Sequence, residues 1–201
     1  MRIIMEFTIL HWFASLHNAV LNPIMYGFTM LGEAGILWII LALLGLTILP
    51  KKYRKAALTM TIALILSVIM CNGIMKNLFH RVRPFIQDPT LVETELFGIF
   101  STIYDWSFPS GHTSASFAAA LACFMWYKKE GITMIVVAAM ISLSRLYLTV
   151  HFPTDVLVSL VLGSLYGVLS YYIVKFLIRK FPKVKEVFEE GKSYKILFSK
   201  S

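Results

Sequence analysis

The sequence predicts an all-α fold: a polytopic membrane bundle of about six transmembrane helices, preceded by an amphipathic helix in the membrane interface. Two observations support this prediction. Of the 201 residues, 58% are hydrophobic and the mean hydropathy is +0.73, which is too apolar for an ordinary soluble domain. Several apolar runs also approach the ~20 residues that a helix needs to cross a bilayer. We expect residues 1–201 to form a single integral membrane domain.

The expected helices follow one another along the chain. Residues 1–18 are expected to form the interfacial helix. A short spanning segment should follow it, because His17, Asn18 and Pro23 interrupt the apolar region of residues 7–30. The other expected spans, of which the first is the shortest, cover residues 35–49, 56–75, 111–127, 132–150 and 156–174.

Basic residues gather in short clusters between the apolar runs, at residues 51–55, 128–129 and 175–185. If every run crosses the bilayer once, all three clusters lie on one side, which the positive-inside rule identifies as cytoplasmic. Residues 182–201 are then a charged tail on that side. Membrane topology thereby accounts for the formal net charge of +8, and no nucleic-acid partner is expected. Three motifs lie on the opposite, extracytoplasmic side.

The first motif is Lys76-x6-Arg83-Pro84, which begins where the run of residues 56–75 ends. A lysine at a helix end often only extends its ammonium group to the lipid headgroups, and this alternative holds for Lys76 taken alone. Arg83 changes the interpretation, because a guanidinium matches the geometry of phosphate oxygens and a nearby ammonium adds a compact charge. Together, Lys76 and Arg83 predict a phosphate clamp.

The second motif, Pro109-Ser110-Gly111-His112, comes directly before an apolar run. Ser110 suits a helix N-cap, and capping alone would explain it. A glycine at the positive end of a helix also lets an anion approach the backbone N–H groups. His112 would then lie beside that anion and donate a proton to a departing oxygen, although taken singly it also fits an ordinary interfacial histidine.

The third motif is Ser144-Arg145-x5-His151-x3-Asp155. Arg145 lies in an apolar helix, where a charge is costly and usually functional. His151 and Asp155 flank Pro153, which suits the first turn of the next helix. If their side chains meet, the carboxylate can hold one imidazole nitrogen protonated and leave the other free to attack. An Asp in a first helical turn also complements the helix dipole, and this alternative stays open.

Together the three motifs resemble the complete signature of the type 2 phosphatidic acid phosphatase superfamily, whose members include lipid phosphatases and vanadium haloperoxidases. The resemblance covers about residues 56–175 and implies a lipid phosphatase that needs no metal or other cofactor and works through a phosphohistidine. It implies that His151 attacks phosphorus, that Asp155 orients His151, and that His112 protonates the leaving oxygen. The implied phosphate-binding groups are Lys76, Arg83, Ser110, Gly111 and Arg145.

The same resemblance bears on substrate and location. It extends to phosphatases of undecaprenyl pyrophosphate, phosphatidylglycerophosphate and phosphatidic acid, and the first is favoured because the site is expected to face outward from the cell membrane. A non-catalytic lipid-binding or transport protein would not need both His112 and His151. A zinc site made of these histidines with His80 and Asp155 is opposed by three nearby cations. The loop of residues 85–108 is either a solvated connection or a lid.

Overall fold

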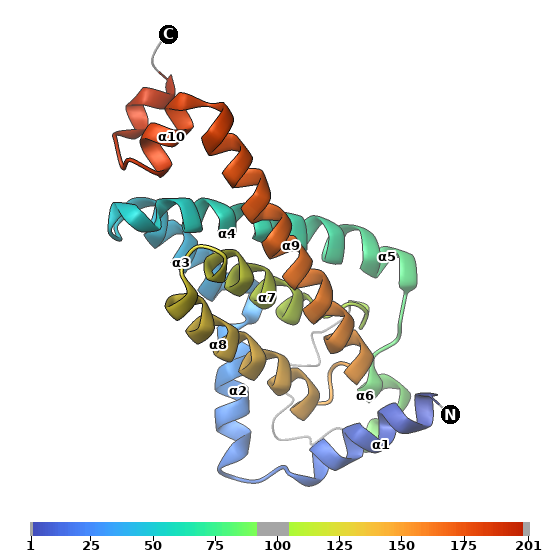
Figure 1. Cartoon of the computed structure of the whole chain (residues 1–201). Helices are drawn as coiled ribbons and strands as arrows, with labels where there is room; N and C mark the ends of the chain where they lie inside the picture. Colours follow the sequence, from blue (N-terminus) through green and yellow to red (C-terminus); the bar gives the residue numbers. More distant parts are fainter. Residues whose placement is uncertain (1, 92–104, 199–201) are drawn as a thin grey trace.

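The computed structural model describes residues 2–91 and 105–198, which form helices joined by short connections, with no strand in either range (Figure 1). The longer helices are α1 (Arg2–Ser15), α2 (Leu21–Leu31), α3 (Ile36–Thr47), α4 (Arg54–Ser67), α7 (Gly111–Phe124), α8 (Lys128–Tyr147) and α9 (Pro153–Lys180). Shorter segments are η1 (Glu33–Gly35), η2 (Lys51–Tyr53), the π-helix η3 (Val68–Met75), α5 (Lys76–Phe79), α6 (Pro84–Gln87), η4 (Pro89–Leu91), α10 (Pro182–Phe188) and η6 (Tyr194–Phe198).

Helix α7 lies at the centre of the bundle, where it packs against α4, α8 and α9 (Figure 1). Close approach is possible because small residues line the contacts. A Cβ atom on Gly163 of α9 would lie 2.4 Å from the carbonyl oxygen of Ser114, and one on Gly167 would lie 2.7 Å from that of Ala118. Small residues of this kind let helix backbones meet in lipid, where apolar surroundings give helices little hydrophobic reason to associate.

Fewer helices meet the length of a full span than the sequence predicted. Three segments are long and apolar enough to cross a bilayer: Lys51–Gln87, Lys128–Tyr147 and Pro153–Lys180. The pair α2 and α3, bent by 43°, is a fourth if it counts as one span. The structure therefore supports a helical membrane protein with three to four spans in its described residues, and the expected six are not confirmed. Helices α1 and α7 have 14 residues each, too few for a complete crossing.

The N-terminal helices break where polar residues interrupt the apolar pattern. Helix α1 ends at Ser15, and the side-chain oxygen of Asn18 then accepts the N–H groups of Val20 and Leu21 at 3.0 and 2.9 Å. Pro23 lies in the first turn of α2, where a missing N–H group costs nothing. The interfacial location of α1 stays a prediction.

Helix α4 continues through η3 into α5, so that Lys76 follows the long apolar segment without a break. His80 then takes a left-handed backbone conformation with φ of 46°, which ends the helix and redirects the chain. Arg83 comes directly before α6, which begins at Pro84. This turn places both residues of the first motif at the same end of the bundle as the starts of α7 and α9 (Figure 1).

The C-terminal segment folds back onto the connection between α3 and α4. The guanidinium of Arg54 donates to the carbonyl oxygen of Lys192 at 2.8 Å and lies 4.4 Å from the centre of the Tyr194 ring. Val187 of α10 is fully buried. The segment predicted as a charged tail thus contacts the bundle as far as Tyr194, and its cytoplasmic location stays a prediction.

Candidate active site

The three motifs meet around a cavity of about 410 Å³. Its walls include six of the residues predicted from the sequence: Lys76, Arg83, Gly111, His112, Arg145 and His151. The cavity lies at the N-terminal end of α7, whose helix dipole directs its positive end toward it. Three basic side chains and this helix N-terminus favour an anion there.

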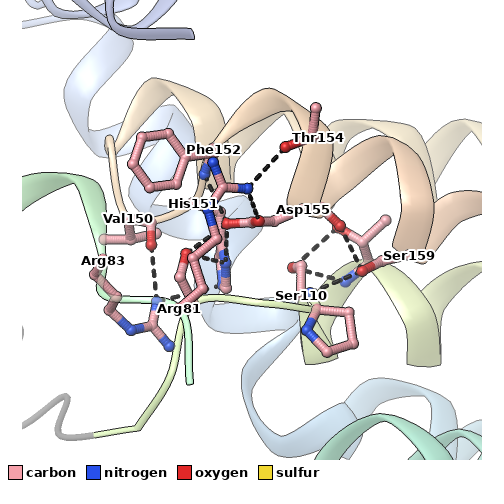
Figure 2. A network of polar contacts seen from close by, with 12 residues as sticks. Arg81, Arg83, Ser110, Val150, His151, Phe152, Thr154, Asp155 and Ser159 are labelled. Atoms are coloured by element: carbon pink, nitrogen blue, oxygen red, sulfur yellow. Dashed lines mark hydrogen bonds and ion pairs between the residues drawn. The ribbon is translucent and has the colours of Figure 1, made fainter. Parts of the chain in front are cut away.

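His151 lies in the short connection between α8 and α9 and is 1% exposed. Its Nε2 atom lies 3.3 Å from Nη1 of Arg83, which also donates to the carbonyl oxygen of Val150 at 2.8 Å (Figure 2). Burial, together with the charges of Arg83, Arg145 and Lys76, lowers the pKa of His151 well below its ordinary value. A neutral imidazole, with a lone pair on Nε2, is the form in which histidine acts as a nucleophile.

Asp155 lies directly behind His151, in the first turn of α9 (Figure 2). Its Oδ2 atom is 3.7 Å from Nδ1 of His151, beyond a direct hydrogen bond. The hydroxyl of Ser107 donates to that same Oδ2 and lies 3.5 Å from Nδ1. Oδ2 also accepts the backbone N–H of Phe152 at 2.9 Å, so Asp155 caps the helix as well. Ser107, which the sequence did not single out, therefore lies between the carboxylate and the imidazole.

The other oxygen of Asp155 is held by Arg81, again a residue given no role from the sequence. Arg81 Nη1 donates to Asp155 Oδ1 at 2.5 Å (Figure 2). Its Nη2 donates to Glu6 of α1 at 2.6 Å. Glu6 is 4% exposed and also accepts the hydroxyl of Thr154. The signal available in the sequence was a carboxylate inside the apolar first helix, where an ionised side chain usually has a partner.

In this structure the carboxylate of Asp105 pairs with both side chains of the predicted phosphate clamp. Its carboxylate forms an ion pair with Nζ of Lys76 and accepts from Nη2 of Arg83 at 2.6 Å. Partial burial opposes ionisation of Asp105, but Arg83 and Lys76 outweigh it and lower the pKa of the carboxyl to about 2. The loop of residues 85–108, expected to be either a solvated connection or a lid, lies largely outside the described residues, and Asp105 is part of its described end.

The second motif forms the N-terminus of α7. Ser110 is fully buried, and its hydroxyl accepts from the backbone N–H of Thr113 at 3.4 Å. Its hydroxyl therefore serves as an N-cap and does not line the cavity. Gly111 does line it, and a Cβ atom there would lie 3.0 Å from the side-chain oxygen of Asn72. The first turn of α7 can thus offer its backbone N–H groups to an anion.

The far wall of the cavity contains Arg145 and His112. Arg145 is 3% exposed and donates to the hydroxyl of Thr29 in α2, and within the described residues its Nε atom has no hydrogen-bond partner. A buried donor without a partner is costly, and a bound anion would satisfy it. His112 Nε2 lies 3.3 Å from Oε2 of Glu33.

His80, proposed in the zinc alternative, lies outside this arrangement. Its ring stacks edge-on against Trp106, with 4.9 Å between the ring centres. Within residues 2–91 and 105–198, no three His, Cys, Asp or Glu side chains are placed to hold a metal ion.

Known proteins are similar to this chain in sequence and in fold. A lipid A 4'-phosphatase of Porphyromonas gingivalis is 30% identical over 78% of this chain and 69% of its own length. A putative undecaprenyl-diphosphatase of Escherichia coli is 34% identical over 69% of this chain and 65% of its own length. The crystal structure of a phosphatidylglycerolphosphate phosphatase from Bacillus subtilis, described as a transmembrane PAP2-type enzyme, superimposes with a TM-score of 0.64 at 26% identity, covering 88% of this chain and 86% of that one. The PAP2 superfamily profile matches residues 52–179, and the chain therefore belongs to the PAP2 superfamily.

Proposed function

We propose that this protein is a metal-independent lipid phosphatase that works through a phosphohistidine on His151. The observation that carries the proposal is the position of His151. It lines a cavity whose walls also contain Lys76, Arg83, Arg145 and His112, and its Nε2 lies 3.3 Å from Nη1 of Arg83. A buried neutral imidazole beside three cations is suited to attack a phosphate, since the cations neutralise the charge that otherwise repels a nucleophile.

The first half of the reaction forms a bond between His151 Nε2 and phosphorus and breaks the bond to the leaving oxygen. His112 gives its proton to that oxygen. Lys76, Arg83, Arg145 and the N–H groups at the start of α7 stabilise the equatorial oxygens of the transition state. In the second half, a water attacks phosphorus, His112 accepts its proton, and His151 leaves as a neutral imidazole.

The groups behind His151 keep it in the reactive tautomer. Ser107 can accept the proton of Nδ1 while donating its own to Asp155, so the hydroxyl relays the orienting effect of the carboxylate. Arg81 in turn forms ion pairs with both Asp155 and Glu6 and so connects the two carboxylates. As phosphorus binds Nε2, the imidazole gains positive charge, and the nearby carboxylate of Asp155 stabilises it.

The substrate proposed first is undecaprenyl pyrophosphate, in the cell membrane and at its extracytoplasmic face. Relatives described as undecaprenyl-diphosphatases support it, and so do the lysine and arginine clusters at the opposite ends of the helices. The alternatives are phosphatidylglycerophosphate and phosphatidic acid. The B. subtilis structural relative supports the former.

The decisive experiment measures phosphate release by protein purified in detergent, with a metal chelator present and the three lipids offered separately. We expect chelator-resistant release by the wild type and none by His151→Ala. His11→Ala is the matched control, because this histidine is half exposed and pairs with Asp88 outside the cavity. Release that persists in His151→Ala would exclude the phosphohistidine. A folded wild type that binds these lipids without releasing phosphate would instead be a binding or transport protein.

A further inference from the structure

Between α2 and α3 the chain breaks against the active site. A Cβ atom on Gly32 would lie 2.9 Å from Cδ2 of His112 and 2.5 Å from Cγ2 of Ile141. The backbone at Gly32 therefore lies directly on the imidazole, in a space that admits no side chain. Any residue next to Gly32 is held at a fixed place beside His112.

The break has an unusual backbone. Ala34 has φ of 47° and Gly35 has φ of 69°, both in the left-handed region. Glycine takes this conformation freely, but for alanine it costs about 1–3 kcal/mol. Strained backbone persists where the surrounding structure holds it, and it is concentrated at functional sites. Here the strained turn directs Glu33 into the wall of the cavity.

The carboxylate of Glu33 meets the ring of His112. Its Oε2 atom lies 3.3 Å from Nε2, without the alignment of a full hydrogen bond, so that Nε2 is buried with no hydrogen-bond partner among the described residues. Catalytic contacts are often loose before substrate binds and tighten in the complex. A small rotation of either side chain would complete the hydrogen bond between Glu33 and His112.

The charges around His112 explain what the carboxylate does. Burial is the largest effect that disfavours a second proton on the imidazole of His112, and the charges of Arg145 of α8 and Lys76 at the start of α5 add to it. Asp105 lies farther away, against Lys76 and Arg83. The phosphate clamp thus works against the acid that the reaction needs. Glu33, which lines the same cavity, supplies the opposing negative charge beside Nε2 of His112.

We propose that Glu33 is a positioning residue for the leaving-group acid: it holds the Nε2 proton of His112, so that the doubly protonated ring donates its Nδ1 proton to the leaving oxygen. This inference rests on the proposed role of His112. It adds to that role a dependence on the leaving group: the reaction needs Glu33 only where the leaving oxygen needs a proton from His112. An alcohol resembles water, whose pKa is about 15.7, and needs a proton to leave. A phosphate, with a second pKa of about 6, leaves readily as an anion.

The test compares Glu33→Gln with wild type on phosphatidic acid, which releases an alcohol, and on undecaprenyl pyrophosphate, which releases a lipid phosphate. We expect kcat to fall about 10- to 100-fold on the monoester, within the usual contribution of a general acid, and less than about threefold on the diphosphate. Glu33→Asp should recover part of the loss. Glu130→Gln, a carboxylate at the opposite end of the bundle, is the control.

A second comparison separates this role from a structural one. In a His112→Ala background, Glu33→Gln should cause no further loss on the monoester, because its effect acts through His112. Equal losses on both lipids, or a further loss without His112, would overturn the inference. If His151→Ala retains activity on both lipids, the proposed phosphatase mechanism itself fails, and that result is independent of Glu33.

Discussion

In the proposed mechanism Lys76 and Arg83 bind a phosphate group, and replacing Asp105 tests whether its carboxylate competes with that group. Its carboxylate pairs with both Lys76 and Arg83. The lowering of its pKa from 3.8 to about 2 corresponds to about 2 kcal/mol of interaction with these cations. The side chain is 52% exposed, so solvent screening reduces this to about 1 kcal/mol. Because the pKa is lowered, the interaction is complete above pH 4 and is lost as the pH falls toward 2.

At neutral pH, Asp105→Asn should therefore strengthen phosphate binding about fivefold, since the competing charge is removed. The assay is product inhibition: inorganic phosphate is titrated against lipid hydrolysis, and its inhibition constant is compared between variants. Asp88→Asn is the matched control, because Asp88 pairs with His11 and does not line the cavity. An inhibition constant that is unchanged or larger in Asp105→Asn would show that Asp105 helps to build the phosphate site and does not compete for it.

Three further changes test the groups behind the nucleophile and the packing of the core. Asp155→Asn should lower kcat by about 10²–10⁴-fold without changing the helical content, because it removes the charge that stabilises the imidazolium; normal turnover would disprove an orienting role. Ser107→Ala should lower kcat about tenfold, the value of one hydrogen bond, and an unchanged rate would mean that Asp155 acts on His151 without the hydroxyl. Gly163→Ala should lower the free energy of unfolding by about 1–3 kcal/mol in detergent, because its Cβ would lie 2.4 Å from the carbonyl oxygen of Ser114. Gly27→Ala should not lower the free energy of unfolding, because nothing lies within 4 Å of the new Cβ. Equal effects of the two substitutions would show that close packing at Gly163 is unimportant.

The sequence predicted six of the residues that line the cavity because their positions follow fixed local rules. Lys76 and Arg145, for example, are charges at the ends of apolar helices. Asp155 and Ser110 were also predicted at the site but do not line the cavity. Asp155 lies behind His151, and the hydroxyl of Ser110 caps α7, one of the two uses that the sequence left open.

The residues that the sequence missed act over long separations. Glu6 reaches Arg81 from 75 positions away, and Ser107 reaches Asp155 from 48. Glu33 meets His112 only because a left-handed turn at Ala34 redirects the chain, and alanine gives no signal of such a turn. Pairings of this kind depend on how the helices pack, which neither periodicity nor motif spacing determines.

The expected number of spans is not confirmed for a related reason. Hydropathy measures how apolar a segment is, but it does not distinguish lipid contact from burial within the protein. The run at residues 111–127 is apolar because α7 is surrounded by other helices, and its helix ends after 14 residues. The break at residues 32–35 likewise divides an apolar region into two bent pieces.

The contact of α7 with α9 sets how the two histidines are spaced. His112 belongs to the first helix and His151 immediately precedes the second, and their backbones touch through Gly163 and Gly167 with no long side chain between them. Backbone contacts have little freedom to adjust, so the acid and the nucleophile should keep their separation whatever lipid surrounds the bundle. Helix α2 packs instead against α8, where Arg145 donates to Thr29, and α3 packs against α4 and α7. Adaptation to lipids of different bulk is expected at α2 and α3, which lie outside the α7–α9 contact that spaces the two histidines.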